Sequence, residues 1–241
     1  MRQGLPAAGG GRWVDVAPER LTGWLDRFAN RHGPVTWSGS PLAWTATASD
    51  GAVADCQVPF PPLRLDMGAH VREPGANPPG TGADDDSPGH RLAAHALVER
   101  RVGVLLVRLG GFAMGVFEGP RLAASKVGAR QVHGRSAAGG RSQQRFARRR
   151  DGQVRVALGA AADAAAGVLL PAVAALDAVV LGGERRAAAQ VLDDPRLAPL
   201  RGLVVDTFLT VPDPRRRVLD ESPARFRAVR IRIVEPAPTD S

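Results

Sequence analysis

The chain has 241 residues, 44% of them hydrophobic and 23% charged, which is typical of a soluble globular protein with one large or two small domains. Its net charge of +8 and pI of about 11.3 favour a nucleic-acid or other polyanionic partner. One cysteine excludes a disulfide framework and a cysteine metal site, and the absence of a long apolar run or secretory signal predicts a cytoplasmic protein without a membrane span.

The first 72 residues predict a small α+β region. Leu21, Trp24, Leu25 and Phe28 recur at helical spacing, so a helix is expected over Glu19–His32. Short strands bounded by turn residues are expected at Arg12–Val16, Val35–Trp37, Ala43–Ala48 and Val53–Val58. All four tryptophans of the chain lie in this region and are expected to form its core (Trp13, Trp24, Trp37 and Trp44).

Residues 73–89, EPGANPPGTGADDDSPG, predict an exposed linker. The acidic triplet within it, Asp84 to Asp86, has no histidine nearby and is interpreted as solvated charge rather than a metal site. A helix over Arg91–Arg101 is expected to open a second domain over residues 90–210.

Residues 90–210 predict an α+β or α/β domain with a mixed sheet and the order β-β-β-α-β-α-β. The expected elements are a hairpin of Gly103–Leu109 and Phe112–Glu118 joined by Gly110 and Gly111, a strand over Arg121–Val132, an alanine-rich helix from Ser142 to about Leu170, a strand at Ala178–Leu181, a helix at Glu184–Leu192 and a strand at Leu203–Asp206. This connectivity is that of RNase H-like folds. Within residues 211–241, the alternating segment Arg225–Val234 predicts a strand, and its expected place is a sheet with the N-terminal strands.

The stretch between Gly119 and Arg150 contains nine cations and no carboxylate. Arginine suits bidentate phosphate contacts. A GC-rich genome explains part of the arginine excess, but not its clustering. Arg145, Arg148 and Arg149 are spaced to form one cationic helix face, which favours contact with phosphates over a merely solvated surface.

Within this stretch, residues 133–146 read HGRSAAGGRSQQRF. Gly139 and Gly140 permit backbone conformations closed to other residues, and Gln143 offers a hydrogen-bond donor and an acceptor. An amide cannot serve as a general base, so any chemistry here depends on positioning water. A flexible surface loop with a glutamine beside it fits the composition equally well.

Other catalytic patterns are missing from the sequence. It contains no GxGxxG, P-loop, GxSxG or HExxH motif, so no cofactor is expected. Asp177, Glu184 and Asp206 are too scattered to propose a two-metal nuclease site.

The basic stretch resembles the catalytic loop of eukaryotic and archaeal peptide-chain release factors. In that family His-Gly-Arg leads into Gly-Gly-Gln and an Arg-Phe-Ala-Arg helix follows; here His133-Gly134-Arg135, Gly139-Gly140 and Arg145-Phe146-Ala147-Arg148 match. Aligned on Arg145-Phe146, Arg141 replaces the family's glutamine, and the loop is longer by three residues, 136–138. The variant Gly140-Arg141-Ser142-Gln143 is similar to the Gly-x-x-Gln of Vms-like release factors, and its arginine-rich form resembles their actinobacterial branch (VLRF).

The resemblance implies a peptidyl-tRNA hydrolase that acts in ribosome rescue on the large ribosomal subunit, as a monomer and without a metal. Gln143 would orient the attacking water, and Gly139 and Gly140 would let the loop enter the peptidyl-transferase centre. The implied RNA contacts are Arg130, Arg135, Arg141, Arg145, Arg148 and Arg149. Arg141 also supports an alternative, a non-catalytic RNA-binding protein of the same fold, and an RNase H-like nuclease is a third hypothesis.

Overall fold

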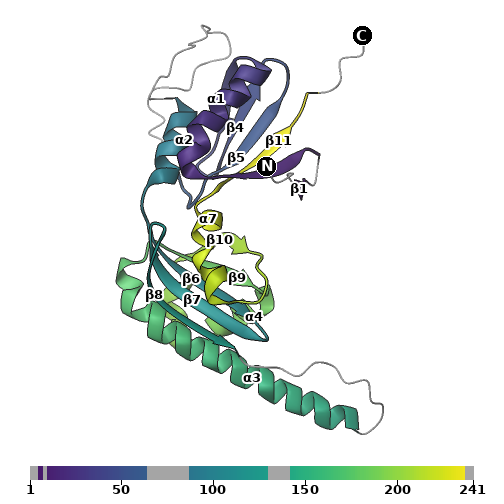
Figure 1. Cartoon of the computed structure of the whole chain (residues 1–241), viewed down its shortest axis with the longest axis vertical. Helices are drawn as coiled ribbons and strands as arrows, with labels where there is room; N and C mark the ends of the chain where they lie inside the picture. Colours follow the sequence, from purple (N-terminus) through teal and green to yellow (C-terminus); the bar gives the residue numbers. More distant parts are fainter. Residues whose placement is uncertain (1–4, 8–9, 64–86, 130–141, 237–241) are drawn as a thin grey trace. The chain divides into compact units, whose positions relative to one another are not determined.

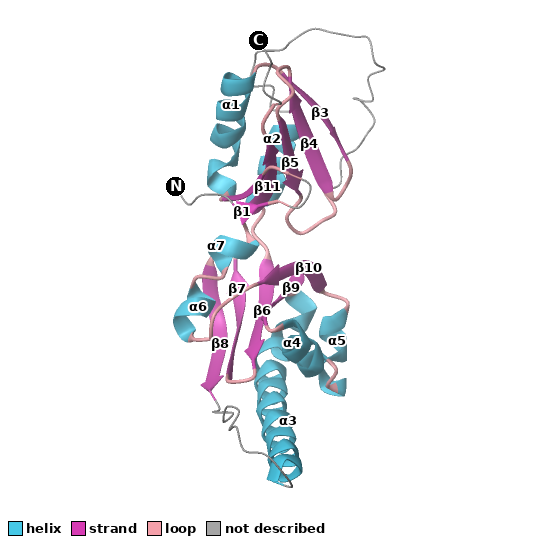
Figure 2. Ribbon diagram, turned by 90° about the vertical axis from the view of Figure 1, so that its right-hand side faces the viewer, coloured by secondary structure: helices cyan, strands magenta, loops and turns pink. Residues whose placement is uncertain are grey.

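The computed structural model describes residues 5–7, 10–63, 87–129 and 142–236, with the backbone alone for residue 5 and residues 142–151. By backbone packing the chain divides into two compact units. One comprises Met1–Val98 and Arg227–Ser241, and the other comprises Glu99–Phe226. Each unit has its own sheet (Figures 1 and 2), so the architecture is a mixed α+β one.

The first unit has a six-stranded sheet in the order β1-β2-β11-β5-β4-β3. Its strands are β1 (Leu5–Pro6), β2 (Arg12–Val16), β3 (Val35–Gly39), β4 (Ala43–Ala48), β5 (Val53–Gln57) and β11 (Val229–Val234), and its helices are η1 (Pro18–Arg20), α1 (Leu21–His32) and α2 (Pro88–Leu97). The alternation predicted a strand here, and β11 lies in this sheet, where it pairs antiparallel with β2 and β5. Ile231 and Ile233 of β11 are buried in one core with Leu21 of α1 and Leu92 of α2.

The tryptophans differ in how far they enter that core. Trp44 is buried, whereas Trp24 and Trp37 are only partly buried and pack against the core. The Trp13 ring lies 4.6 Å from the Arg230 guanidinium, which stacks on it. The expectation of a tryptophan core therefore holds fully for Trp44 alone.

Cys56 lies in β5 and is fully buried. Burial, with a smaller contribution from the Asp55 charge, raises the pKa of its thiol to about 12. Because the thiolate is the reactive form, we expect no reaction of the folded protein with a disulfide reagent such as dithionitrobenzoate at about pH 8. Full reaction should follow unfolding in guanidinium, and fast reaction before unfolding would contradict this burial.

The second unit has a five-stranded mixed sheet in the order β10-β9-β6-β7-β8. Its elements are β6 (Arg101–Arg108), β7 (Gly111–Glu118), β8 (Arg121–Ala129), α3 (Ser142–Leu169), η2 (Leu170–Ala175), β9 (Ala178–Gly183), α4 (Arg185–Leu192), η3 (Pro195–Leu197), α5 (Ala198–Arg201), β10 (Val204–Leu209), α6 (Arg216–Asp220) and α7 (Pro223–Phe226). β9 is parallel to both β6 and β10, and β6-β7-β8 form an antiparallel meander.

Layers cover both faces of this sheet. The core on one face contains Leu105 and Met114 of the sheet, Ala165 of α3 and Val191 of α4. α6 lies on the opposite face, where a Cβ at Gly115 of β7 would be 3.3 Å from Leu219. Residues 102–107 of β6 are accordingly all buried, as expected for a central strand between two layers.

Most expected elements are present with bounds that differ by a few residues, and the largest differences are at α2 and β11. α2 spans Pro88–Leu97 rather than Arg91–Arg101, because the Ser87 hydroxyl accepts a hydrogen bond from the His90 N–H and caps the helix there. It packs in the first unit, not in the second. β11 begins at Val229 rather than Arg225, since Pro223–Phe226 form α7.

Candidate nucleic-acid interface

The basic stretch begins at one edge of the five-stranded sheet. β6, β8, β9 and β10 all run in the same direction, so their carboxyl ends meet at this edge. The strand register places Arg108 opposite Gly111, and Gly111 opposite Ala129, the last residue of β8. At about 4.8 Å between neighbouring strands, Ala129 therefore lies about 10 Å from the end of β6. We call this the carboxyl edge.

The predicted site residues fall into two groups. Arg130, Arg135, Gly139, Gly140 and Arg141 lie outside the described residues. The backbone of the others belongs to α3, in which Gln143 is the second residue and positions 145, 148 and 149 share one helix face (Gln143, Arg145, Arg148 and Arg149). Gln143 is therefore in the first turn of a helix, where backbone N–H groups have no partner within the helix.

α3 is long enough to extend well past the sheet. Its 28 residues span about 42 Å, whereas the eight residues of β6 span about 27 Å. Ala161, Ala165 and Leu169, in its C-terminal half, are buried against the sheet. In Figure 1 the other end of α3 extends beyond the strands. The anchored half thus fixes the direction of the helix on whose first turn Gln143 lies.

Gly152–Ala175 is long and apolar enough, by length and composition, to be a candidate membrane span, with 28% of its most apolar window buried. A core helix of a soluble protein meets the same criterion. Because Ala161, Ala162 and Leu169 pack in the hydrophobic core of the second unit, we interpret this stretch as a core helix.

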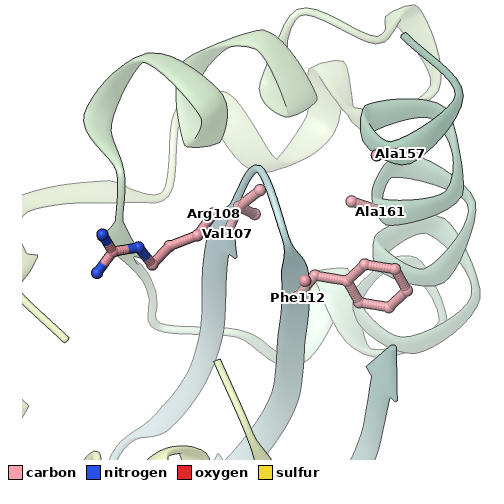
Figure 3. Close-up of a pocket in the computed structure, with 6 residues that line it drawn as sticks. Val107, Arg108, Phe112, Ala157 and Ala161 are labelled. Carbon is pink, nitrogen blue, oxygen red and sulfur yellow. The ribbon is translucent and has the colours of Figure 1, made fainter. Parts of the chain in front are cut away.

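A shallow pocket lies at the carboxyl edge between the β6–β7 hairpin and α3 (Figure 3). Its lining is formed by Val107, Arg108, Gly111, Phe112, Ala157 and Ala161. Phe112 points toward α3, whereas the Arg108 side chain points away from it. A Cβ at Gly128 of β8 would overlap the Phe112 ring, so this glycine lets Phe112 pack across the end of β8. Phe112 therefore packs near Gly128 at the end of β8, and it lines the pocket with Ala157 and Ala161 of α3.

Three exposed arginines also lie at the carboxyl edge, outside the basic stretch. Arg108 ends β6, and Arg185 and Arg186 begin α4. A backbone hydrogen bond of 2.8 Å from the Glu184 N–H to the Val107 oxygen holds the two chain segments together. Sequence reasoning missed these arginines because their proximity depends on β6 and β9 being parallel neighbours. The available signal was their position immediately after apolar strand segments.

Acidic residues do not gather at this edge into a metal site. Within the described part of the chain, no three His, Cys, Asp or Glu side chains lie close enough together to hold a metal ion. Asp177 instead accepts a 2.7 Å hydrogen bond from the backbone N–H of Arg101, at the opposite end of β6. Asp206 lies within β10, and Glu184 lies just before α4.

The comparisons with known proteins place this unit in a family. A family model described as acVLRF1, Actinobacteria/chloroflexi VLRF1 release factor, matches residues 100–232, more than half of the chain. The chain belongs to the Actinobacteria/chloroflexi VLRF1 release factor family. This family is described as one of release factors.

Solved structures show similarity at low sequence identity. A crystal structure of the archaeal translation termination factor aRF1 is 14% identical with a TM-score of 0.41, covering 88% of this chain and 56% of that one. A structure described as an archaeal protein is 15% identical with a TM-score of 0.40, covering 76% of this chain and 52% of that one. The chain thus spans about half the length of these two proteins, and no curated protein matches it.

Proposed function

We propose that the chain is a peptidyl-tRNA hydrolase that cleaves the ester between a nascent peptide and tRNA on stalled large ribosomal subunits. The observation that carries the proposal is the family match over residues 100–232, which includes the whole basic stretch and Gln143. Residues 99–226 would be the catalytic unit, with an RNase H-like topology as the expected class. We further propose that the protein acts in the cytoplasm, as a monomer and without a metal or cofactor.

In the proposed reaction, water attacks the carbonyl carbon of the ester. The bond from that carbon to the tRNA 3′ oxygen breaks, and this oxygen leaves with a proton. Gln143 would hold the attacking water through its amide, because an amide orients water but does not remove its proton. Gly139 and Gly140 would let the loop approach the tRNA end closely.

The arginines would supply the contacts to RNA. Arg130, Arg135 and Arg141 lie in or beside the loop and would contact the tRNA end or ribosomal RNA. Positions 145, 148 and 149 share a face of α3, which would place Arg145, Arg148 and Arg149 along one line of phosphates. Arginine is suited to this because its planar guanidinium binds phosphate in a bidentate manner.

A non-catalytic RNA-binding protein is the second candidate. The observation that favours it is Arg141, which stands where related release factors have their glutamine. In that case Gln143 would be an ordinary residue of the first turn of α3, and the arginines would provide the entire function.

Incubation of the purified chain with large subunits that carry labelled peptidyl-tRNA distinguishes the candidates. A hydrolase yields free peptide and tRNA with an intact 3′ end. A nuclease yields peptide still joined to a tRNA fragment, and a non-catalytic protein leaves peptidyl-tRNA whole. We expect free peptide and intact tRNA, and either of the other two products would contradict the proposal.

A further inference from the structure

The described arginines of the second unit differ in their partners. Several of those away from the carboxyl edge are paired with carboxylates, whereas Arg201 and Arg225 donate hydrogen bonds to backbone oxygens. The pairs are Arg101 and Arg121 with Glu118, Arg196 with Asp163 and Asp194, Arg215 with Asp213, Arg216 with Asp220, and Arg217 with Glu221. Hydrogen bonds from Arg196 lower the pKa of the Asp194 carboxyl to about 2, which shows how fully that guanidinium is engaged.

The three arginines of the carboxyl edge have different contacts. Arg108 donates a 3.1 Å hydrogen bond to the backbone oxygen of Val211. The Arg185 guanidinium lies 4.2 Å from the centre of the Phe208 ring. Among the described residues, no carboxylate forms an ion pair with Arg108, Arg185 or Arg186.

These contacts orient the guanidinium groups without neutralising them. A guanidinium has five N–H donors in one plane. The cation–π contact of Arg185 with Phe208 involves no hydrogen bond, so it leaves the N–H donors of the guanidinium available. The hydrogen bond to Val211 uses one donor of Arg108 and leaves its charge unpaired. Both side chains are thereby partly ordered before any ligand binds, which lowers the entropic cost of binding.

The position of Arg185 and Arg186 is also unfavourable for the stability of helix α4. Cations in the first turn of a helix are unfavourable because that end already carries partial positive charge. The first turn of α4 nevertheless contains Arg185 and Arg186 and no acidic residue. The carboxylate nearest to Arg185 and Arg186 along the chain is Glu184, and its single negative charge is smaller than the total positive charge of the three arginines. Such an arrangement suits a polyanion that supplies the missing negative charge.

We propose that Arg108, Arg185 and Arg186 form a docking surface for the phosphate backbone of RNA, separate from the predicted loop and α3 contacts. The surface rests on the proposed function for the identity of its partner. The strand register places it in the same row as Ala129, from which the predicted loop departs. RNA bound there would orient the second unit while the loop reaches the tRNA end.

Filter binding of labelled deacylated tRNA tests this surface. The triple variant R108Q/R185Q/R186Q should bind about tenfold more weakly or worse. Its salt dependence, plotted as log K against log salt concentration, should become shallower by about 0.9 for each phosphate that the variant no longer binds. The matched control R196Q/R216Q/R217Q removes the same charge from arginines that are paired with carboxylates, and should bind tRNA nearly as tightly as the unmodified chain.

The double variant R108Q/R186Q keeps the stack of Arg185 on Phe208, so it tests the surface if the triple variant does not fold. Unchanged tRNA affinity of the test variant would overturn the docking surface. An equal decrease in affinity for the test and control variants would mean that only net charge matters, which also overturns it. Peptide release by the unmodified chain is measured separately, so failure of the docking surface can be distinguished from failure of the proposed hydrolase.

Discussion

Gln143→Ala is expected to slow peptide release from large subunits carrying peptidyl-tRNA by about 10²-fold or more. The reason is that the amide would no longer hold water in line with the ester carbon, and misplacement of a reactant by about 1 Å already costs about 10²-fold. Alanine is a strong helix former, so α3 should keep its backbone. The measurement is single-turnover release at saturating protein, which separates the chemical step from binding.

Gln144→Ala is the matched control for this experiment. It removes the same amide from the neighbouring position of α3, which points about 100° away around a helix. We expect Gln144→Ala to release peptide within a few fold of the unmodified chain, and both variants to bind large subunits equally. Unchanged release by Gln143→Ala would remove Gln143 from the mechanism, whereas equally slow release by both variants would indicate damage to the helix.

Local sequence signals were sufficient where an element is fixed by its own residues. β4 has the expected bounds, Ala43–Ala48, because turn residues flank an alternating run. The β6–β7 hairpin likewise follows from its two apolar runs, although the connection is Leu109-Gly110 and Gly111 is the first residue of β7. α3 begins at Ser142 as expected, and it continues to Leu169 because its sequence is rich in alanine, a strong helix former.

The errors arose where a short helix begins in a segment that resembles a loop. The linker expected over residues 73–89 includes Ser87 and Pro88, yet serine as a cap followed by proline is a helix-start signal. Pro223 similarly starts α7, but the alternating pattern of the following strand was extended back to Arg225, so this short helix was not predicted. The Phe226 ring packs edge-on against Phe117 at 5.6 Å, a contact over more than a hundred residues that no local pattern reveals.

The candidate site also contains residues that local sequence predicts and residues that only the fold brings together. Gln143 and the cations around it are close together in the sequence, so composition and motif spacing were enough to predict them as candidates. The arginines of the carboxyl edge come from β6 and α4, more than seventy residues apart. Their common location depends on strand order, and strand order is set by long-range packing of β6 against β9. Basic residues at the ends of parallel strands could be identified once the sheet was known.

Gly183→Ala is expected to destabilise the second unit by about 3 kcal/mol, a value within the range for strained core substitutions. Gly183 has a φ of +94°, and a Cβ there would overlap the backbone oxygen of Val107. That oxygen accepts the hydrogen bond from the Glu184 N–H, so its displacement would loosen the junction of β6 with α4. The substitution should therefore disturb the same edge that orients Arg108 and Arg185.

Chemical unfolding followed by far-ultraviolet circular dichroism measures this effect, because much of the helix content belongs to α3. Gly167→Ala, in an open position of α3, is the control and should be neutral or stabilise by up to about 1 kcal/mol. All four tryptophans belong to the first unit, so their fluorescence reports on that unit separately. If the circular-dichroism midpoint of Gly183→Ala equalled that of the unmodified chain, the close approach of Gly183 to Val107 would be wrong. A lower midpoint together with weaker tRNA binding would show that the carboxyl edge orients its arginines through this junction.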